Sequence, residues 1–217
     1  MKVGAVLLAA GAGSRLGGRP KSLLVLDGVP LIGRAVDALT GAGVAPIVVV
    51  LGHYADEIGR ALRERPVMVA RNATPDDGQP ASLRAGMQAL PDSLDALDAV
   101  IVMLADQPLI NRDDINALIN AFTQRGTKRM VVPRVNGLPG NPVVIDAALL
   151  ATWRAGDVNA TGRRWRETNP AGVHWFDTDN AHYQVDIDTP ADLLRFAERT
   201  GFELTWPLNF DADSSAL

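Results

Sequence analysis

The chain has 217 residues, of which 47% are hydrophobic and 21% charged, and its formal net charge is −4. This balance is ordinary for a globular protein and argues against a nucleic-acid surface, which needs a basic footprint. The sequence contains no cysteine, which excludes disulfides and thiolate metal sites. No apolar run reaches the roughly 18 residues of a membrane span, so we expect a cytoplasmic protein that binds neither membrane nor nucleic acid.

Residues 3–10 are apolar or small and predict a strand buried on both faces of a parallel sheet. We do not read them as a secretory signal, because the run is short for one and begins a repeating βα pattern. The glycine-rich loop that follows, residues 11–21, can aim successive N–H groups at an anion. Arg15 and Lys21, one of only three lysines, add positive charge to this loop.

The loop departs from both common phosphate-binding motifs. It begins like the dinucleotide fingerprint, but Leu16 stands where that pattern needs a small residue. A Walker A loop needs Gly-Lys-Ser/Thr, whereas Arg19 and Pro20 separate Gly18 from Lys21. A flexible turn with two solvated cations is the alternative that these residues leave open.

Residues 8–24, LAAGAGSRLGGRPKSLL, resemble the signature loop of nucleotidyltransferases and, most closely, that of molybdenum cofactor cytidylyltransferase-like proteins. Ala9-Ala10 favours this branch over the guanylyltransferases, which usually carry Ala-Gly-Gly and then Ser. The resemblance implies a bound nucleoside triphosphate, with CTP favoured, and places Lys21 and Arg15 on its phosphates. The loop residues that it assigns to nucleotide binding are Ala9, Ala10, Gly11, Gly13 and Ser14.

The βα pattern continues after the loop. The spacing predicts a helix from Pro30 to about Leu39, a strand over 47–51, a helix over 55–63 and a short strand over 67–70. Strands that alternate with helices in this way pair in parallel through right-handed crossovers.

Residues 72–86 form a polar loop that leads into a predicted helix over 82–90. An ordinary capped surface loop is one interpretation. The segment also resembles the second motif of the family, through which it would recognise the base near the triphosphate. The matching residues are Asn72, Gly78, Ser82, Leu83 and Gly86.

A strand predicted over 99–104 ends at Asp106-Gln107-Pro108. Ligands of open α/β sheets bind outside the carboxyl ends of the strands, where Asp106 would serve as a metal ligand or general base. The stretch resembles the Asp-Gln-Pro motif of the family, whose Asp binds Mg²⁺. We expect Asn111 to cap the next helix, which runs to about Phe122.

Residues 130–133 predict a further strand, and Asn136-Gly137 a tight turn toward residues 142–145. This pattern indicates an antiparallel excursion over the active face. Asn141 replaces the His of the family's Gly-His-Pro, which leaves the acceptor open.

After a helix predicted over 146–153, Gly156, Asp157 and residues 161–163 resemble a Gly-Asp segment of the family. The next helix carries Arg163, Arg164 and Arg166. These arginines form either a solvated face or a contact to a substrate phosphate.

Near the C-terminus, Asp186 and Asp188 flank Ile187, which we expect in the core. A helix then starts at Thr189-Pro190. Asp188 would act as its cap or, through resemblance to the family's Asp-Ile-Asp-Thr-Pro motif, as the second Mg²⁺ ligand beside Asp106. Asp186 is the alternative ligand.

Together these observations predict an α/β, Rossmann-like three-layer sandwich with a mostly parallel sheet and a small antiparallel excursion, and the resemblance implies that it is of the nucleotide-diphospho-sugar transferase type. We expect one domain over 1–200 and a tail over 201–217. The resemblance implies Mg²⁺-dependent transfer of CMP from CTP to a molybdopterin-type phosphorylated acceptor, with Lys21, Arg15 and Asp106 as catalytic residues and a molybdoenzyme as client. The alternatives are a transferase that uses GTP or a sugar phosphate, and a non-catalytic nucleotide-binding maturation factor.

Overall fold

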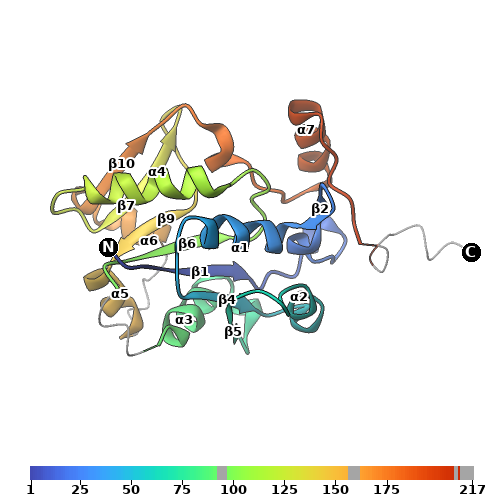
Figure 1. The fold of residues 1–217 in the computed structure, drawn as a ribbon, viewed down its shortest axis with the longest axis horizontal. Coiled ribbons are helices and arrows are strands. Elements are labelled where there is room, and N and C mark those ends of the chain that lie inside the picture. The colour runs from blue at the N-terminus through green and yellow to red at the C-terminus, as the bar shows by residue number, and fades with distance from the viewer. Residues whose placement is uncertain (92–96, 156–161, 208–209, 211–217) are drawn as a thin grey trace, which may run out of the picture.

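The computed structural model describes residues 1–91, 97–155, 162–207 and 210, and its centre is an eight-stranded sheet with helices on both faces (Figure 1). The strands of this sheet are β1 (Val3–Ala9), β4 (Ile47–Leu51), β5 (Met68–Arg71), β6 (Ala99–Leu104), β7 (Met130–Val135), β8 (Leu138–Pro139), β9 (Val143–Asp146) and β10 (Val173–Asp177). Their order is β10-β7-β9-β6-β1-β4-β5, with β8 paired to β7. The hairpin of β2 (Val25–Leu26) and β3 (Val29–Pro30) forms a second, two-stranded sheet. The predicted fold class is confirmed.

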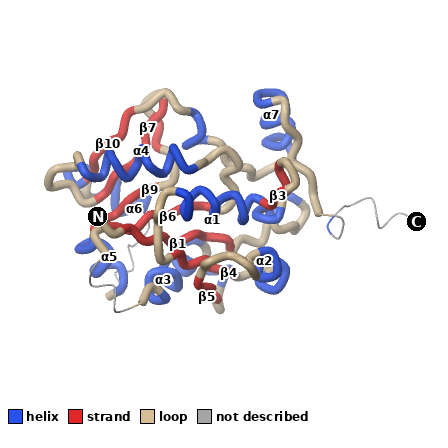
Figure 2. The backbone as a smooth tube through the Cα atoms, in the orientation of Figure 1, coloured by secondary structure: helices blue, strands red, loops and turns tan. Residues whose placement is uncertain are grey.

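The helices form two layers, one on each face of the sheet (Figure 2). One layer contains α1 (Leu31–Gly41), α2 (Ala55–Ala61) and α4 (Arg112–Thr123). The other contains α3 (Gln79–Ala89) and α5 (Ala147–Arg154), and the remaining helices are α6 (Gly162–Thr168) and α7 (Pro190–Thr200). No helix within the described ranges is both long and apolar enough to cross a membrane.

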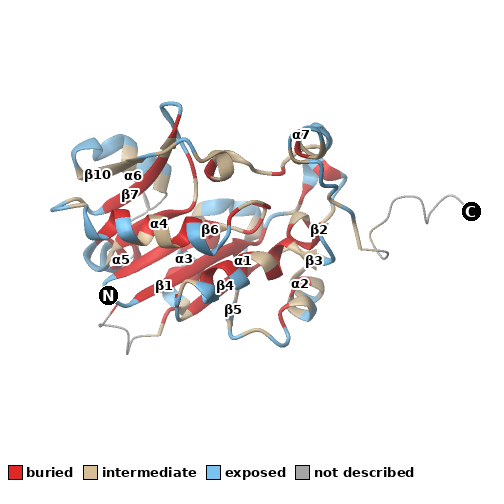
Figure 3. Ribbon diagram, turned by 45° about the horizontal axis from the view of Figure 1, so that its top comes forward, coloured by how far each residue is buried: buried red, intermediate tan, exposed pale blue. Residues whose placement is uncertain are grey.

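Strand β1 shows why both faces need a helical layer. Ala5 and Leu7 point into the core beneath α1 and α4, whereas Val6 and Leu8 point into the core above α3. Side chains alternate along a strand, so a run that is apolar at every position must be covered on both sides. Figure 3 shows the central strands buried throughout, with the exposed residues on the outer helices and loops.

The site lies between the neighbouring strands β1 and β6, and the connections that follow these two strands run toward opposite edges of the sheet. The two strands are parallel, with Leu8 opposite Leu104, so Ala10 and Asp106 emerge side by side at the same edge. After β1 the chain crosses over to β4, and after β6 it crosses to β7 on the other side. Such a switch point leaves a crevice at the carboxyl ends of the strands.

Two local expectations are corrected, and a third lies outside the described residues. The antiparallel strand β9 belongs to the main sheet, between β6 and β7, rather than lying over the active face. Strand β8 lies off the strand order and pairs with β7. Helix α3 starts at Gln79, three residues before the expected position, because Pro80 suits the first turn of a helix. Gly156, Asp157 and Thr161 lie outside the described residues.

A third, small core lies beside the glycine-rich loop. Its buried residues come from that loop, the β2–β3 hairpin, α1, the segment after β10 and α7: Leu16, Leu24, Leu26, Leu31, Ile187 and Phe196. Leu204 and Trp206 pack against it from the C-terminal side. One cluster of apolar side chains therefore fixes the two segments that carry Lys21 and Asp188.

Candidate active site

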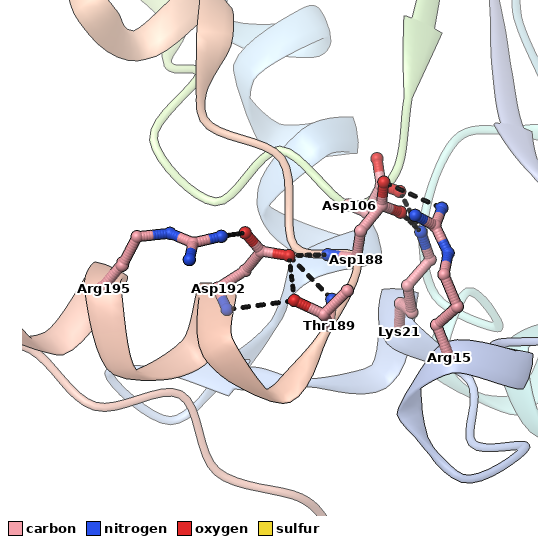
Figure 4. Close-up of polar contacts among 7 residues, drawn as sticks. All are labelled: Arg15, Lys21, Asp106, Asp188, Thr189, Asp192 and Arg195. Atoms are coloured by element: carbon pink, nitrogen blue, oxygen red, sulfur yellow. Dashed lines mark hydrogen bonds and ion pairs between the residues drawn. The ribbon is translucent and has the colours of Figure 1, made fainter.

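Lys21 is the centre of the site. Its Nζ donates to Oδ2 of Asp106 at 2.5 Å and to Oδ1 of Asp188 at 2.6 Å (Figure 4). Burial lowers the pKa of Lys21, but the two carboxylates raise it further, so that it lies above its ordinary value. The side chain is therefore an ammonium ion at neutral pH, held between acids that come from distant parts of the sequence.

Arg15 joins the same cluster from a short 3-10 turn, Ser14–Leu16. Its Nη2 lies 2.9 Å from Oδ2 of Asp188, and 65% of its side chain is exposed. An ion pair this exposed contributes roughly 0–1 kcal/mol, so the guanidinium can turn to a stronger anion at little cost. Gly13 makes the turn possible: its φ is 61°, and a Cβ there would lie 1.8 Å from the carbonyl oxygen of Arg19.

The carboxylate of Asp106 has spare bonding capacity. Oδ2 accepts from Lys21, whereas Oδ1 is buried and has no hydrogen-bond partner among the described residues. A buried oxygen without a partner is costly unless a water, an ion or a ligand supplies one. The described part of the chain has no cluster of three acidic, His or Cys side chains with metal-binding geometry. Mg²⁺ often takes only one or two carboxylates and completes its shell with phosphates and water.

Asp188 is not the cap of α7. The N-cap is Thr189, whose hydroxyl accepts from the backbone N–H of Asp192, while the Asp192 carboxylate accepts from the N–H groups of Thr189 and Asp188 (Figure 4). Arg195 forms an ion pair with Asp192 on the outer side. This capping box leaves the Asp188 carboxylate facing Lys21, which removes the cap as its explanation.

Asp186 differs from Asp188 in its surroundings. Burial and the neighbouring charges of Asp106 and Asp188 raise its pKa to about 6, against the opposing effect of Lys21. Its Oδ1 is buried without a partner among the described residues, and the side chain lines a separate cavity beside α7. Ile187 between the two acids is fully buried, as predicted.

A cavity of about 440 Å³, here called the first cavity, surrounds the cluster. The predicted site residues that line it are Ala9, Ala10, Gly11, Arg15, Lys21, Gly78, Ser82, Asp106 and Asp188. Gly13, Ser14 and Asn72 do not line it. The sequence interpretation missed Ser22, Pro75 and Gln79, which also contribute to the wall; Ser22 follows Lys21 directly, and the other two lie inside the second motif.

Asn72 supports the wall from behind. Its Nδ2 donates to Oγ of Ser82 at 3.0 Å, and its Oδ1 accepts from the N–H of Thr74. Both Asn72 and Ser82 are buried. The role of Asn72 in this structure is therefore to position Ser82 and the loop after β5.

A second cavity of about 230 Å³ shares Leu8, Gln79 and Leu104 with the first. Its floor is apolar, and its polar wall contains Asn141, Arg163 and Arg166. Burial is the main cause that lowers the pKa of Arg166, and the neighbouring charge of Arg163 acts in the same direction. Two guanidinium groups over an apolar floor suit a ligand that has a flat or apolar body and an anionic group.

Asn141 is tied to the segment that leads to the acids. Its carbonyl accepts from Nε2 of Gln107 at 3.1 Å, and its N–H donates to the carbonyl of Tyr183 at 2.9 Å. Gly140 approaches that carbonyl so closely that a Cβ would lie 2.4 Å from it. The backbone of residues 140–141 thus joins the wall of the second cavity to Gln107, which follows Asp106, and to Tyr183, which lies in the segment before Asp186 and Asp188.

Comparison with known proteins gives a consistent family. A family model described as the MobA-like NTP transferase domain matches residues 5–173. The bifunctional protein GlmU of Heliobacterium modesticaldum is 32% identical over 87% of this chain, which spans only 41% of that relative. Nicotine blue oxidoreductase of Paenarthrobacter nicotinovorans is 30% identical over 88% of this chain and 94% of its own length. A nucleotidyl transferase from Methanothermobacter thermautotroptrophicus superposes with a TM-score of 0.71 at 28% identity, covering 91% of this chain and 97% of that one.

Proposed function

We propose the following function for this chain, which belongs to the MobA-like NTP transferase family. It is a nucleotidyltransferase that moves CMP from CTP to a molybdopterin-type phosphorylated acceptor. The observation that carries the proposal is the convergence of Lys21, Arg15, Asp106 and Asp188 in one cavity at the carboxyl ends of β1 and β6. Two cations and two carboxylates, placed together, are what a reaction between two anions requires.

The glycine-rich loop would bind the triphosphate. Among the described residues, the N–H groups of Gly11, Ala12 and Gly13 donate to no other backbone group. Successive N–H groups without a backbone partner are available to an anion, to which Lys21 and Arg15 would add full charges. The loop can therefore hold the β- and γ-phosphates and stabilise the pyrophosphate that leaves.

The acidic pair fits a divalent cation. The unpartnered Oδ1 of Asp106 and the carboxylate of Asp188 are the hard oxygen donors that Mg²⁺ prefers, and we assign both residues as its ligands. When bound, Mg²⁺ supplies positive charge to the transferring phosphoryl group. The ammonium of Lys21 stands between the same carboxylates, so metal binding and the movement of Lys21 toward phosphate would favour each other.

The second cavity would receive the acceptor. Arg163 and Arg166 suit its phosphate, because a guanidinium matches phosphate with two parallel hydrogen bonds, and the apolar floor suits a pterin ring. The shared wall at Leu8, Gln79 and Leu104 would place the acceptor beside the α-phosphate.

The proposed reaction needs no covalent enzyme intermediate. An oxygen of the acceptor phosphate attacks the α-phosphorus, a new P–O bond forms, and the bond to the β-phosphate breaks to release pyrophosphate. The chain's own part is to align the two anions and to offset their repulsion through Lys21, Arg15 and the loop N–H groups.

CTP is the nucleotide that Ala9-Ala10 favours, through resemblance to the cytidylyltransferase branch. Ala9 and Ala10 line the first cavity together with Ser82 and Gly78, which supports a base site between these segments. Transfer from GTP, or to a sugar phosphate, would use the same cations and acids. These alternatives would differ in the residues that line the first cavity, which binds the base, or the second cavity, which binds the acceptor.

A pyrophosphate-release assay tests the proposal. Each of the four nucleoside triphosphates is supplied with Mg²⁺, with and without molybdopterin, and with a sugar 1-phosphate as the competing acceptor. We expect release only with CTP and the pterin acceptor. Release with a sugar phosphate would move the protein to that alternative, and nucleotide binding without release under any condition would favour the maturation factor.

A further inference from the structure

The C-terminal segment, residues 202–207, returns to the glycine-rich loop instead of leaving the molecule. Thr205 and Val25 exchange two backbone hydrogen bonds, of 2.8 and 3.1 Å, as an antiparallel bridge. Figure 1 shows the chain after α7 passing beside β2. The bridge fixes the position of the next residue, Trp206.

Trp206 holds one residue of the loop, Arg19. The Cζ of Arg19 lies 4.3 Å from the centroid of the Trp206 ring, within the range of a cation–π interaction. Nη1 of Arg19 also donates to the carbonyl of Phe210 at 3.4 Å, and Phe210 packs edge to face on Tyr54. The tyrosine hydroxyl in turn donates to the carbonyl of Gly18.

Arg19 also contacts the turn that carries Arg15. Its Nε donates to the carbonyl of Leu16 at 3.1 Å, and its own carbonyl lies against Gly13. Gly13 and Leu16 bound the turn on either side of Arg15. Trp206 is therefore connected through Arg19 to the turn that carries Arg15, although Trp206 and this turn come from opposite ends of the sequence.

The same segment closes the small core beside the loop. Leu204 and Trp206 pack against the cluster that contains Leu16, Leu24 and Ile187. Leu24 follows the turn of Lys21, and Ile187 precedes Asp188. The C-terminal segment thus supports both the cationic and the acidic side of the site.

We propose that Trp206 and Arg19 are positioning residues that hold the glycine-rich loop ready for the phosphates of a nucleoside triphosphate; the identity of this ligand rests on the proposed function. A loop that is already ordered loses less conformational entropy on binding, and so binds more tightly. Lys21 and Asp106 are untouched by the contact. Its loss should therefore weaken nucleotide binding.

The test compares three variants at one temperature below their unfolding transitions. Trp206→Leu keeps apolar bulk without a ring, Trp206→Phe keeps a ring, and Phe202→Ala is the matched control, since Phe202 is half exposed in the same segment. The probes are CTP with Mg²⁺ in calorimetry and hydrogen exchange of a peptide that covers residues 13–21. We expect Trp206→Leu to raise the Kd about fivefold or more and to speed exchange, while the other two stay within about twofold of wild type.

Arg19→Met tests the contact from its other side. It should weaken CTP binding as Trp206→Leu does, and adding Trp206→Leu to it should cause little further loss. Additive losses, a Trp206→Phe variant as weak as Trp206→Leu, or unchanged binding in both single variants would overturn the proposal. If Trp206→Leu does not fold, the CTP affinity and the hydrogen exchange of Arg19→Met and Trp206→Phe decide whether the proposal holds.

The two proposals fail in distinguishable ways. A wild-type protein that binds no nucleoside triphosphate would refute the proposed function. Hydrogen exchange of residues 13–21 would still report on the contact in that case, and unchanged exchange in Trp206→Leu would refute the positioning role.

Discussion

Nζ of Lys21 lies 2.5 Å from Oδ2 of Asp106, and this ion pair joins the glycine-rich loop to the carboxyl end of β6. Less than a fifth of either side chain is exposed, so solvent screens the pair far less than it screens a surface ion pair. Lys21 neutralises the acids of the site in this arrangement. It also lines the first cavity together with Arg15, so both cations can meet a phosphate that enters there.

Lys21→Ala should lower kcat/KM about 100-fold or more, because it removes a preorganised charge that the transition state uses. Steady-state pyrophosphate release measures this loss. Lys2→Ala is the matched control, since Lys2 lies at the N-terminus before β1. Wild-type kinetics in Lys21→Ala would remove this lysine from the reaction.

Asp106→Ala and Asp188→Ala should each abolish Mg²⁺-dependent turnover, and the double variant should be no worse than the single ones. The reason is that two ligands of one ion act as a unit, so their effects do not multiply. Calorimetric titration with Mg²⁺ in the presence of CTP measures the binding directly. Losses that multiply in the double variant would contradict a shared ion.

Asp188→Asn isolates the charge of Asp188, since Thr189 and Asp192 provide the cap of α7. We expect helix stability to be unchanged and metal-dependent activity, measured as pyrophosphate release, to fall. Full activity in this variant would favour Asp186 as the ligand instead.

Asp186 makes the stability of the metal-free protein depend on pH. Its pKa is raised on folding from the ordinary value of 3.8 to about 6, so the folded chain holds this proton more tightly than the unfolded chain does. The stabilising contribution is complete below about pH 4 and is lost as pH rises through about 6. Asp186→Asn should therefore raise the free energy of unfolding at about pH 7.5, by up to about 3 kcal/mol.

Urea unfolding in EDTA, from about pH 4 to about pH 8, measures this dependence. Asp76→Asn is the control, because 88% of the Asp76 side chain is exposed. A stability profile of Asp186→Asn that runs parallel to that of wild type would show that Asp186 does not titrate in this window.

Arg166→Gln should raise the KM for the acceptor about tenfold or more and leave the Kd of CTP unchanged, because Arg166 lines only the second cavity. Arg164→Gln on the same helix is the matched control, since Arg164 lines neither cavity. Equal effects of the two variants would mean that the helix, rather than one guanidinium, matters to the acceptor.

CTP should bind more tightly than GTP in the presence of Mg²⁺, because polar groups matched to one base edge are left unpaired by the other base. Ser82→Ala should narrow this difference. A bulkier residue at Gly78 is a poorer test of the base site, since the φ of 82° at this position strains any side chain placed there. Calorimetry with both nucleotides decides the point, and GTP binding equally well would favour the guanylyltransferase alternative.

The sequence alone was enough to predict the elements that depend on local rules. The apolar runs of β1, β4 and β6 and the Asn111 cap of α4 were found at or near their observed bounds, because periodicity and capping act within a few residues. The glycine-rich loop was recognised for the same reason. Its glycines, its two cations and its place after a buried strand are all local features.

Only the tertiary structure decided which residues meet. Lys21 with Asp188, Asn72 behind Ser82, and Trp206 on Arg19 all depend on strand order and on the small core beside the loop. The same holds for β9, whose two partners in the sheet are β6 and β7. Such contacts join segments far apart in the chain, and their geometry follows from packing the whole sheet. The sequence determined what chemistry the loop offers, and the fold determined which acids, cavity walls and terminal residues act on it.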